Sequence, residues 1–506
     1  MANVPDFGNI ILNTDSYKHS HHVLYPPGTE YVSSYIESRG GPYPAHLVVG
    51  LQAYLRQYLL KPITVEDIDE AERVTREHRI PFNREGWLGV LNDHDGYFPV
   101  EIEAVPEGTV LPIKNVLVQV INTDPKYFWV TSFIETSLLR AVWYPTSVGT
   151  LSWLCKQIIR QALEKTSDHP EIIRDILHDY GARGVSSQQS AALGGMAHLV
   201  NFEQTDTIVG SLAASRYYNA VAPGASGPNS EHSTMTAWGR ENEASAYANV
   251  INQYYDWQVK VIVSDSYDLK HAVDNIFGKE LKDLILAQKG AVFVRPDSGD
   301  PIATTADTIE GLIAAYGFEA NSKGYKVLPN CIRVCQGDGI TIDSLREIYQ
   351  ELDRRKLAAD NVYFGMGGGL LQQINRDTLH FAMKANAVRV NGEWREIYKS
   401  PSLQNLKSSK AGRLALRYVG GRYETVTRDS IRPEENLLVP VFRNGKLLKR
   451  WDFSELIARS ERPVPEEYYL PVLAPHSRKP APQRERTAAV RDLADYSEGA
   501  RLISSR

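Results

Sequence analysis

From about residue 175 onward the chain repeats one pattern: a short apolar run leads through a polar or glycine-rich loop into a segment whose apolar residues have helical spacing. The apolar runs are VKVIVS, AVFVRP, CIRVCQ and VYFG, and the loops after them are DSYD, DSGDP, GDG and MGGG. Strand–loop–helix units in series predict parallel strands that are covered by helices. The pattern is typical of a (β/α) barrel or a doubly wound sheet, and we expect a barrel-like α/β domain over residues 151–384.

Both ends of the chain alternate apolar and polar residues with a period of two, which is typical of antiparallel strands. EYVSSYIES and VEIEAVPEGTVLPIKNVLVQVINT show this pattern early, before the helical stretch YFWVTSFIETSLLRAVWY, and AVRVNGEWREIYK and GRYETVTRD show it late. We therefore expect residues 1–150 and 385–462 to build a second, mostly β domain. Residues 463–506 are rich in Pro, Arg and small residues, so we expect a C-terminal tail there.

Composition limits the partners and the compartment. A net charge of −5 gives no global attraction to nucleic acid or to an anionic membrane, so local basic residues must hold any anionic substrate. Three cysteines make a disulfide framework implausible. The N-terminal string MANVPDFGNIILNTDSYK lacks the features of a signal peptide, and no run of about 18 apolar residues could span a bilayer. We expect a soluble, cytoplasmic protein with no nucleic-acid or membrane partner.

Several common catalytic signatures are absent from the sequence. No G-x-x-x-x-G-K-[ST], H-E-x-x-H, paired C-x-x-C or G-x-S-x-G string occurs, which argues against a P-loop, the usual zinc sites and the commonest serine hydrolases. The string KHSHH contains His19, His21 and His22, but its spacing fits no standard metal site. Metal ligands therefore stay unassigned.

The loops after the apolar runs carry groups that suit a phosphorylated sugar. Gly367 and Gly368 have no side chains, so backbone N–H groups there could approach a phosphate at a helix start. Arg295 and Asp297 in RPDSGDP offer a guanidinium for an anion and a carboxylate for ribose hydroxyls, and Asp338 in QGDG offers a second carboxylate. Each loop could be a plain turn, but the carboxyl ends of parallel strands meet at one edge, where ligands bind. We expect the site at this edge.

The sequence resembles the nicotinamide phosphoribosyltransferase family over roughly residues 8–460. The matching strings, in the family's order, are TDSYK, YPPGT, AVPEG, LHDYGARGVSSQ, HLVNFEQTDT, SEHSTMTAWG, VSDSYD, RPDSG, QGDG and GMGGGLLQ. Because they extend in order over most of the chain, they are more specific than any single motif. The resemblance implies an irregular (β/α) barrel with a β-rich second domain, and an enzyme that joins nicotinamide to 5-phosphoribosyl-1-pyrophosphate in NAD biosynthesis.

For the base, the resemblance implies that Tyr17 and Tyr180 sandwich the pyridine ring and that Arg183 and Arg295 line the same pocket. Tyr180 stands where the family usually has Phe, which preserves stacking but adds a hydroxyl that needs a partner or solvent. Asp206 would accept a hydrogen bond from the carboxamide of nicotinamide, because an ionised carboxylate attracts an amide and repels another carboxylate.

For the phosphoribosyl group, the resemblance assigns contacts to the sugar and to each phosphate. Asp297, Gly337 and Asp338 would engage the ribose, with Ser264 as a further substrate-binding residue, and Gly367 and Gly368 would bind the 5′-phosphate. The phosphates would be surrounded by Arg39, Arg376, Lys384, Lys399 and Lys407. The catalytic residues would be His232, Asp206 and Asp297, with His232 phosphorylated by ATP to improve substrate capture.

The implied reaction is displacement at the anomeric carbon, in which the pyridine nitrogen attacks as pyrophosphate leaves. Mg²⁺ would neutralise the leaving pyrophosphate, while positioning and electrostatics would supply most of the catalysis. The resemblance also implies a homodimer with shared active sites, to which the partner subunit contributes Tyr17 and Arg39.

Three other functions compete with this one. Nicotinate phosphoribosyltransferase would perform the same chemistry on the acid, and Asp206 argues against it. A barrel aldolase or isomerase needs a Schiff-base lysine or a poised acid–base pair at a strand end, and the four clear strand-end loops offer Asp and Arg but no such lysine. A non-catalytic binding role or a secreted signalling role is disfavoured by the intact set of polar residues and by the lack of a signal peptide.

Overall fold

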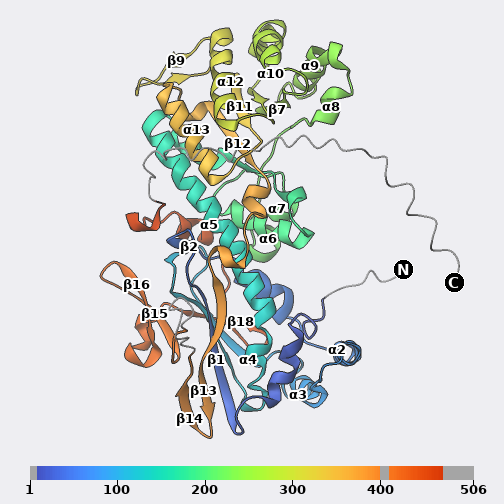
Figure 1. The fold of residues 1–506 in the computed structure, drawn as a ribbon, viewed down its shortest axis with the longest axis vertical. Helices are drawn as coiled ribbons and strands as arrows, with labels where there is room; N and C mark the ends of the chain where they lie inside the picture. The colour runs from blue at the N-terminus through green and yellow to red at the C-terminus, as the bar shows by residue number, and fades with distance from the viewer. Residues whose placement is uncertain (1–7, 399–408, 471–506) are drawn as a thin grey trace, which may run out of the picture. The chain divides into compact units, whose positions relative to one another are not determined.

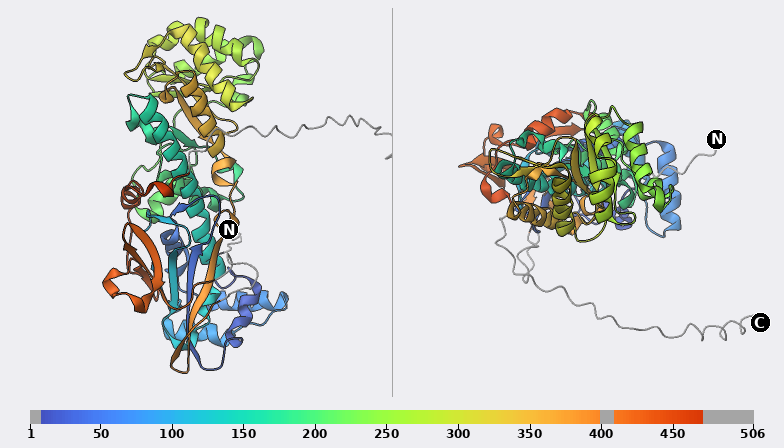
Figure 2. Two further views of the ribbon diagram at one scale, coloured as in Figure 1. Left: turned by 60° about the vertical axis from the view of Figure 1, so that its left-hand side comes forward. Right: turned by 90° about the horizontal axis from the view of Figure 1, so that it is seen from above.

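Strands from both ends of the sequence build one antiparallel sheet of seven strands in the computed structural model, which describes residues 8–398 and 409–470 (Figure 1). The strand order is β14-β13-β1-β5-β3-β17-β18. These strands are β1 (Thr29–Ser38), β3 (Val100–Ala104), β5 (Val116–Asn122), β13 (Phe381–Val390), β14 (Glu393–Glu396), β17 (Val439–Arg443) and β18 (Lys446–Leu447). The blue strand β1 and the orange strand β13 lie side by side, so the sheet joins the two alternating regions of the sequence (Figure 2).

Helix α3 (Arg84–His94) anchors the core beside this sheet. Its N-cap is Asn83, whose side chain accepts a hydrogen bond from the Gly86 N–H at 3.1 Å. Trp87 of this helix is buried, with its ring centroid 4.7 Å from that of Trp129. Burying an aromatic residue of this size contributes about 1.5–3 kcal/mol. The other elements of this layer are β2 (Ala45–Leu47), α1 (Leu51–Tyr54), α2 (Val65–Glu77), β4 (Val110–Pro112), α4 (Val130–Phe133), β15 (Leu414–Val419) and β16 (Arg422–Thr427).

A second sheet contains five parallel strands in the order β6-β12-β11-β8-β7. They are β6 (Leu177–Asp179), β7 (Val259–Val263), β8 (Ala291–Arg295), β11 (Ile332–Gln336) and β12 (Val362–Met366). All but β6 are the apolar runs of the repeating pattern, whose continuous apolar character reflects burial of both strand faces. The helices of this layer include α7 (Ile208–Tyr218), α9 (Glu243–Gln253), α10 (Leu269–His271), α11 (Lys282–Ala287), α12 (Pro301–Tyr316) and α13 (Ile342–Arg354).

The parallel strands form a half-barrel, whereas the sequence predicts an irregular (β/α) barrel. Isolated parallel bridges extend from its two edges and join Asp179 to Thr205, Gln204 to Ala225, and Asn229 to Val261. Each bridge is a single residue pair, and two of the three involve the string APGASGPNS, whose Gly and Pro residues interrupt regular strands. The predicted barrel is therefore confirmed only in part, as a mixed α/β fold with a parallel half-barrel.

Helix α5 (Glu135–Thr166) packs against both layers. It contacts β13 of the antiparallel sheet and also α13 and α6 (Gln188–Leu199) beside the parallel sheet. The domain boundary predicted at residue 150 falls inside α5, so both layers share this helix. The described residues up to Tyr469 form one compact unit. Among the described residues no helix, α5 included, is long and apolar enough to cross a membrane.

The N-terminal half of α5 approaches the chain before α1 closely. Gly50 has a φ of +112°, and a Cβ there would lie 2.3 Å from Pro145 Cγ, so only glycine fits this position. The hydroxyl of Thr146 donates to the Val49 carbonyl at 3.0 Å. These contacts fix the helix against the antiparallel layer.

The packed chain continues past residue 463, where the sequence predicts a tail. Tyr468 is 4% exposed, and the Tyr469 ring stacks on Trp153 of α5 with ring centroids 5.6 Å apart. The predicted start of the tail is therefore wrong, because two tyrosines in the Pro- and Glu-rich string VPEEYYLP bury apolar surface. Residues 471–506 of the predicted tail lie outside the described residues.

Truncation tests this packing. A chain that ends after Arg462 loses the contacts of Tyr468 and Tyr469, whereas a chain that ends after Leu470 keeps them. We expect the shorter chain to lose about 3–5 kcal/mol of stability, the usual cost of removing a buried aromatic side chain. Urea unfolding of both chains measures the difference, and equal stability would show that the two tyrosines do not anchor the C-terminal segment.

Candidate active site

Five strand ends of the parallel sheet present polar residues at one edge. Tyr180 follows β6, Ser264 follows β7, Arg295 ends β8 with Asp297 just beyond it, Gly337 and Asp338 follow β11, and Gly367 and Gly368 follow β12. Because the strands are parallel, their carboxyl ends lie together. The structure thus brings these predicted residues to one place, and their individual roles remain predictions.

The side chain of Tyr180 lies against β12. A Cβ on Gly365 would lie 2.1 Å from the Tyr180 ring, so the ring fits only because that residue is glycine. The Tyr180 hydroxyl accepts a hydrogen bond from Asn229 Nδ2 at 2.9 Å and lies 3.8 Å from Cys335 Sγ. Asn229 Oδ1 accepts a second bond from Arg295 at 3.0 Å. Asn229 was not among the predicted residues, because its string GPNS is typical of an ordinary turn.

His232 opens the short helix α8 (His232–Thr236) between two carboxylates. Its Nε2 lies 3.1 Å from Asp265 Oδ1, and its Nδ1 lies 3.9 Å from Asp297 Oδ2. Asp265 is nearly buried, and its other oxygen accepts hydrogen bonds from the Asp297 N–H at 3.0 Å and from the Ser298 hydroxyl. Asp265 was not predicted, although a carboxylate directly after a buried strand in VSDSYD was an available signal.

Asp206 presents an exposed carboxylate beside the end of β6. Its N–H donates to the Asp179 carbonyl at 3.0 Å, and its side chain accepts a hydrogen bond from the Ser226 hydroxyl. Asp179 itself is buried and accepts the Gly181 N–H at 2.7 Å. Burial, with a smaller contribution from the charge of Asp206, raises the pKa of Asp179 to about 6. Arg183 lies exposed on the short turn that follows.

The turn between β12 and α14 (Gly368–Leu371) leaves its backbone accessible. A Cβ on Gly368 would meet nothing within 4 Å, and one on Gly184 would lie 3.4 Å from Gly368 Cα. Gly337 is packed more tightly, since a Cβ there would lie 2.8 Å from Asp297 Oδ1. Backbone N–H groups without side chains in front of them can approach a phosphate closely.

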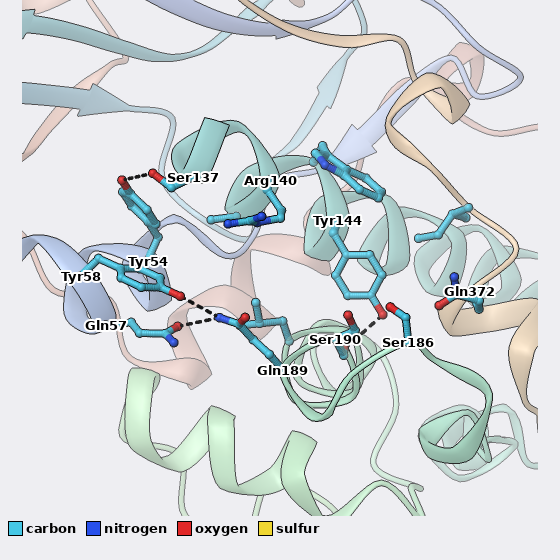
Figure 3. Close-up of a pocket in the computed structure, with 14 residues that line it drawn as sticks. Tyr54, Gln57, Tyr58, Ser137, Arg140, Tyr144, Ser186, Gln189, Ser190 and Gln372 are labelled. Carbon is cyan, nitrogen blue, oxygen red and sulfur yellow. Dashed lines mark hydrogen bonds between the residues drawn. The ribbon is translucent and has the colours of Figure 1, made fainter. Parts of the chain in front are cut away.

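Tyr144 of α5 forms a hydrogen bond at the end of α14, which follows the turn after β12. Its hydroxyl lies 2.9 Å from the Leu371 carbonyl at the end of α14 and 3.1 Å from the Ser190 carbonyl in α6 (Figure 3). The ring also lines a cavity of about 220 Å³, together with Tyr54, Tyr58 and Arg140. One side chain thus ties three helices together beside the predicted phosphate turn.

The predicted phosphate-binding cations lie on the antiparallel layer. Arg39 follows β1, Lys384 lies within β13, and Arg376 opens a short turn before β13. Burial lowers the pKa of Lys384, the charge of Glu135 raises it, and the positive charges of Arg39, Lys18 and Arg376 lower it further, so these four cations, called the basic cluster below, lie near one another and near Glu135. Lys399 and Lys407 lie outside the described residues.

Tyr17 also belongs to the antiparallel layer. It is 55% exposed, and the next residue, Lys18, pairs with Glu135 at the start of α5. Within residues 8–398 and 409–470, no hydrogen bond, ion pair or ring contact joins Tyr17 or the basic cluster to Tyr180 or Asp206. A single chain therefore does not bring the two predicted ring-stacking tyrosines into contact.

The histidines of KHSHH are not arranged as a metal site. His19 is buried with its ring centroid 5.1 Å from that of Phe133, and burial lowers its pKa to about 4. In the described part of the chain, no three His, Cys, Asp or Glu side chains converge as ligands for a metal ion. His19 therefore serves as a packing residue.

The buried carboxyl of Asp179 makes stability depend on pH. Because folding raises its pKa from 3.8 to about 6, the folded protein holds this proton more tightly. The stabilising contribution is complete below about pH 4 and is lost as the pH rises through 6, by on the order of 2–3 kcal/mol.

In urea unfolding, the stability of the wild type relative to Asp179→Asn should therefore fall by this amount between about pH 4 and about pH 7.5. The exposed Asp283→Asn is the matched control. A difference that is constant over this range would contradict the raised pKa.

Two known families match the chain. Residues 176–446 match the nicotinate phosphoribosyltransferase (NAPRTase) family, and residues 9–102 match the nicotinamide phosphoribosyltransferase N-terminal domain. The two matches cover most of the parallel layer and the start of the antiparallel layer.

Relatives and solved structures agree with this match. A Xanthomonas campestris pv. campestris protein called nicotinamide phosphoribosyltransferase is 46% identical over 461 residues, which cover 90% of this chain and 98% of the relative. An Acinetobacter baylyi protein of the same name is 30% identical and covers 88% of this chain and 95% of its own. The structure of human nicotinic acid phosphoribosyltransferase shares the fold, with a TM-score of 0.58 at 16% identity over 90% of this chain and 95% of that one. A family match over more than half of the residues and a close relative of similar length show that this chain belongs to the nicotinate phosphoribosyltransferase family.

Proposed function

We propose that this protein is a nicotinamide phosphoribosyltransferase, which uses phosphoribosyl pyrophosphate to make nicotinamide mononucleotide for NAD biosynthesis. The observation that carries the proposal is the exposed carboxylate of Asp206 beside the strand end that bears Tyr180, in a chain 46% identical to a relative of that name. A carboxylate accepts a hydrogen bond from a carboxamide and repels the carboxylate of nicotinate. This favours nicotinamide over nicotinate as the base.

The reaction would be a displacement at C1 of the ribose. The pyridine nitrogen forms the new bond to C1 while the C–O bond to pyrophosphate breaks, and pyrophosphate leaves with the electron pair. Tyr180 would stack on the ring, and Asp297 and Asp338 would bind the ribose hydroxyls near the positive charge that develops on the sugar. The backbone at Gly367 and Gly368 would hold the 5′-phosphate. No proton has to be removed, so positioning and electrostatic stabilisation would supply the catalysis.

Mg²⁺ fits this site as an ion that the substrate helps to hold. It usually keeps several waters and binds one or two carboxylates plus substrate phosphates, so a site with few protein ligands is compatible with it. Asp297 and Asp338 are the strand-end carboxylates that could contribute. When bound, Mg²⁺ would neutralise charge on the pyrophosphate.

A barrel aldolase remains the weaker alternative. Such an enzyme needs a lysine at the carboxyl end of a strand to form a Schiff base. Lys260 is buried in β7, but its ammonium group donates to the carbonyls of Trp257 and Lys289, which precede β7 and β8. This lysine therefore faces the opposite edge of the sheet.

We also propose that ATP phosphorylates His232. The ring is 46% exposed, and Asp265 holds one ring nitrogen by a hydrogen bond, which leaves the other as a nucleophile. That nitrogen would attack the γ-phosphorus of ATP, and the bond to the departing ADP would break. Asp265 also accepts the Asp297 N–H at 3.0 Å and so couples this histidine to the predicted ribose site.

The two layers of one chain carry complementary halves of the proposed site. Tyr17 and the basic cluster lie on the antiparallel layer, whereas Tyr180, Asp206 and His232 lie beside the parallel sheet. A two-fold homodimer would place each half against its complement from the other subunit. We infer that the enzyme is a homodimer with two shared sites.

The three cysteines bear on the compartment. Cys155, Cys331 and Cys335 are all free thiols, and two of them are buried. Unpaired cysteines of this kind are usual where glutathione keeps thiols reduced. We therefore place the reaction in the cytoplasm.

Asp206→Asn tests the selectivity for the base. The change keeps the shape but removes the charge, so the affinity for nicotinamide should fall by about 1–3 kcal/mol and the discrimination against nicotinate should shrink. Steady-state kinetics with both bases measures both effects. Asp283→Asn is the control, and an unchanged KM for nicotinamide would exclude the role given to Asp206.

His232→Ala should abolish ATP hydrolysis and ATP stimulation without unfolding the protein. The acid-labile label from γ-³²P-ATP should disappear in this variant and persist in His271→Ala, a control at an exposed histidine. Persistent labelling of the His232→Ala variant would mean that another residue is phosphorylated.

Subunit exchange tests the shared sites. Tyr17→Ala and Asp206→Ala place lesions in opposite halves of the site, so random mixing should restore about a quarter of the sites. Tyr17→Ala mixed with Arg39→Ala is the matched control: both lesions lie in the same half, so every mixed site keeps one lesion. No recovery in the first mixture, despite measured exchange, would contradict the shared sites.

A further inference from the structure

Asn229 links Tyr180 to Arg295 by two hydrogen bonds of fixed direction. Its Nδ2 lies 2.9 Å from the Tyr180 hydroxyl, and its Oδ1 lies 3.0 Å from an Nη atom of Arg295. A guanidinium carries only donors, so the oxygen of Asn229 must face Arg295 and its NH₂ group must face Tyr180. The Tyr180 hydroxyl is therefore an acceptor toward Asn229.

The backbone that carries Asn229 is fixed to β7. The Val261 N–H donates to the Pro228 carbonyl at 2.8 Å, the Ser230 N–H donates to the Val261 carbonyl at 2.9 Å, and the Val263 N–H donates to the Ser230 hydroxyl at 2.9 Å. Residues 228–230 thus behave as a short added strand, although they read as a turn in the sequence. The carboxamide of Asn229 has little freedom to move away from its two partners.

Tyr180 and Arg295 are each held by a further contact. The Tyr180 ring occupies the space that a side chain on residue 365 would fill, and its hydroxyl lies 3.8 Å from Cys335 Sγ. The second Nη atom of Arg295 donates to the Ser230 carbonyl at 3.0 Å. Asn229 is the group that connects these two side chains.

We propose that Asn229 is a positioning residue for recognition of the base. Its hydrogen bond to the Tyr180 hydroxyl holds the ring that stacks on nicotinamide, and its hydrogen bond to Arg295 holds that guanidinium beside the ring. The inference rests on the proposed function, because that function places Tyr180 and Arg295 at the nicotinamide site. A ring that is already held loses less freedom when the base binds, so affinity should depend on the hydrogen bond. The Tyr180 hydroxyl thus serves to hold the aromatic ring in place.

A double-mutant cycle tests this inference. Tyr180→Phe removes only the hydroxyl, and Asn229→Leu keeps the volume of the side chain but removes both polar groups. Tyr180→Phe should raise the KM for nicotinamide about three- to ten-fold, the usual worth of one hydrogen bond, and Asn229→Leu should raise it at least as much, because it also frees Arg295; kcat should change less in both variants. Because both changes break the same bond, the double variant should be no weaker than Asn229→Leu within about two-fold.

Two further variants sharpen the result. Cys335→Ala removes the weaker contact of the same hydroxyl and should change KM by less than about two-fold. Asn229→Ala repeats the cycle without relying on how leucine packs. Wild-type turnover of nicotinamide tests the proposed function by itself, so an inactive wild type would be distinguished from a failed cycle. Effects that multiply in the double variant, or a Tyr180→Phe enzyme with an unchanged KM for nicotinamide, would overturn the inference.

Discussion

Parallel hydrogen bonding between five short strands is the constraint on which the candidate site depends. It forces the carboxyl ends of β6, β12, β11, β8 and β7 to one edge, so that residues from distant parts of the sequence become neighbours. Hydrogen bonds made by side chains then connect neighbouring strand-end loops to one another. Asp265 joins His232 to Asp297, and Asn229 joins Tyr180 to Arg295.

The two layers present different charged groups at the proposed site: Arg183 and Arg295 accompany the carboxylates of the parallel layer, and most of the predicted phosphate-binding cations lie on the antiparallel layer. The parallel layer presents the carboxylates of Asp206, Asp297 and Asp338, which suit the uncharged base and the hydroxyls of a sugar. The antiparallel layer holds the basic cluster, which suits phosphates. A substrate that combines a ribose with a pyrophosphate needs both, and this division is the physical reason why two copies are expected to complete each site.

Much of the parallel sheet and its strand-end residues could be predicted from the sequence, because short local patterns of apolar and polar residues determine them. The apolar runs predict β7, β8, β11 and β12 since a buried parallel strand must be apolar on both faces. Strand β6 was not among the repeating units, because three residues are too few to show a period. The Gly- and Pro-rich string around Asn229 is typical of a loop, and its bridge to β7 depends on long-range contacts. Tyr469 likewise looks like part of a tail in the sequence, because its stacking on Trp153 of α5 is a long-range contact.

If the proposed function is right, the strand-end residues select nicotinamide and position it to receive a phosphoribosyl group. The most direct measurement offers the purified protein nicotinamide and nicotinate together, with phosphoribosyl pyrophosphate and Mg²⁺, and identifies the nucleotide by mass spectrometry while pyrophosphate is quantified. We expect nicotinamide mononucleotide and an equal amount of pyrophosphate, with little nicotinate mononucleotide. Nicotinate mononucleotide as the main product, or no pyrophosphate at all, would contradict the proposed function.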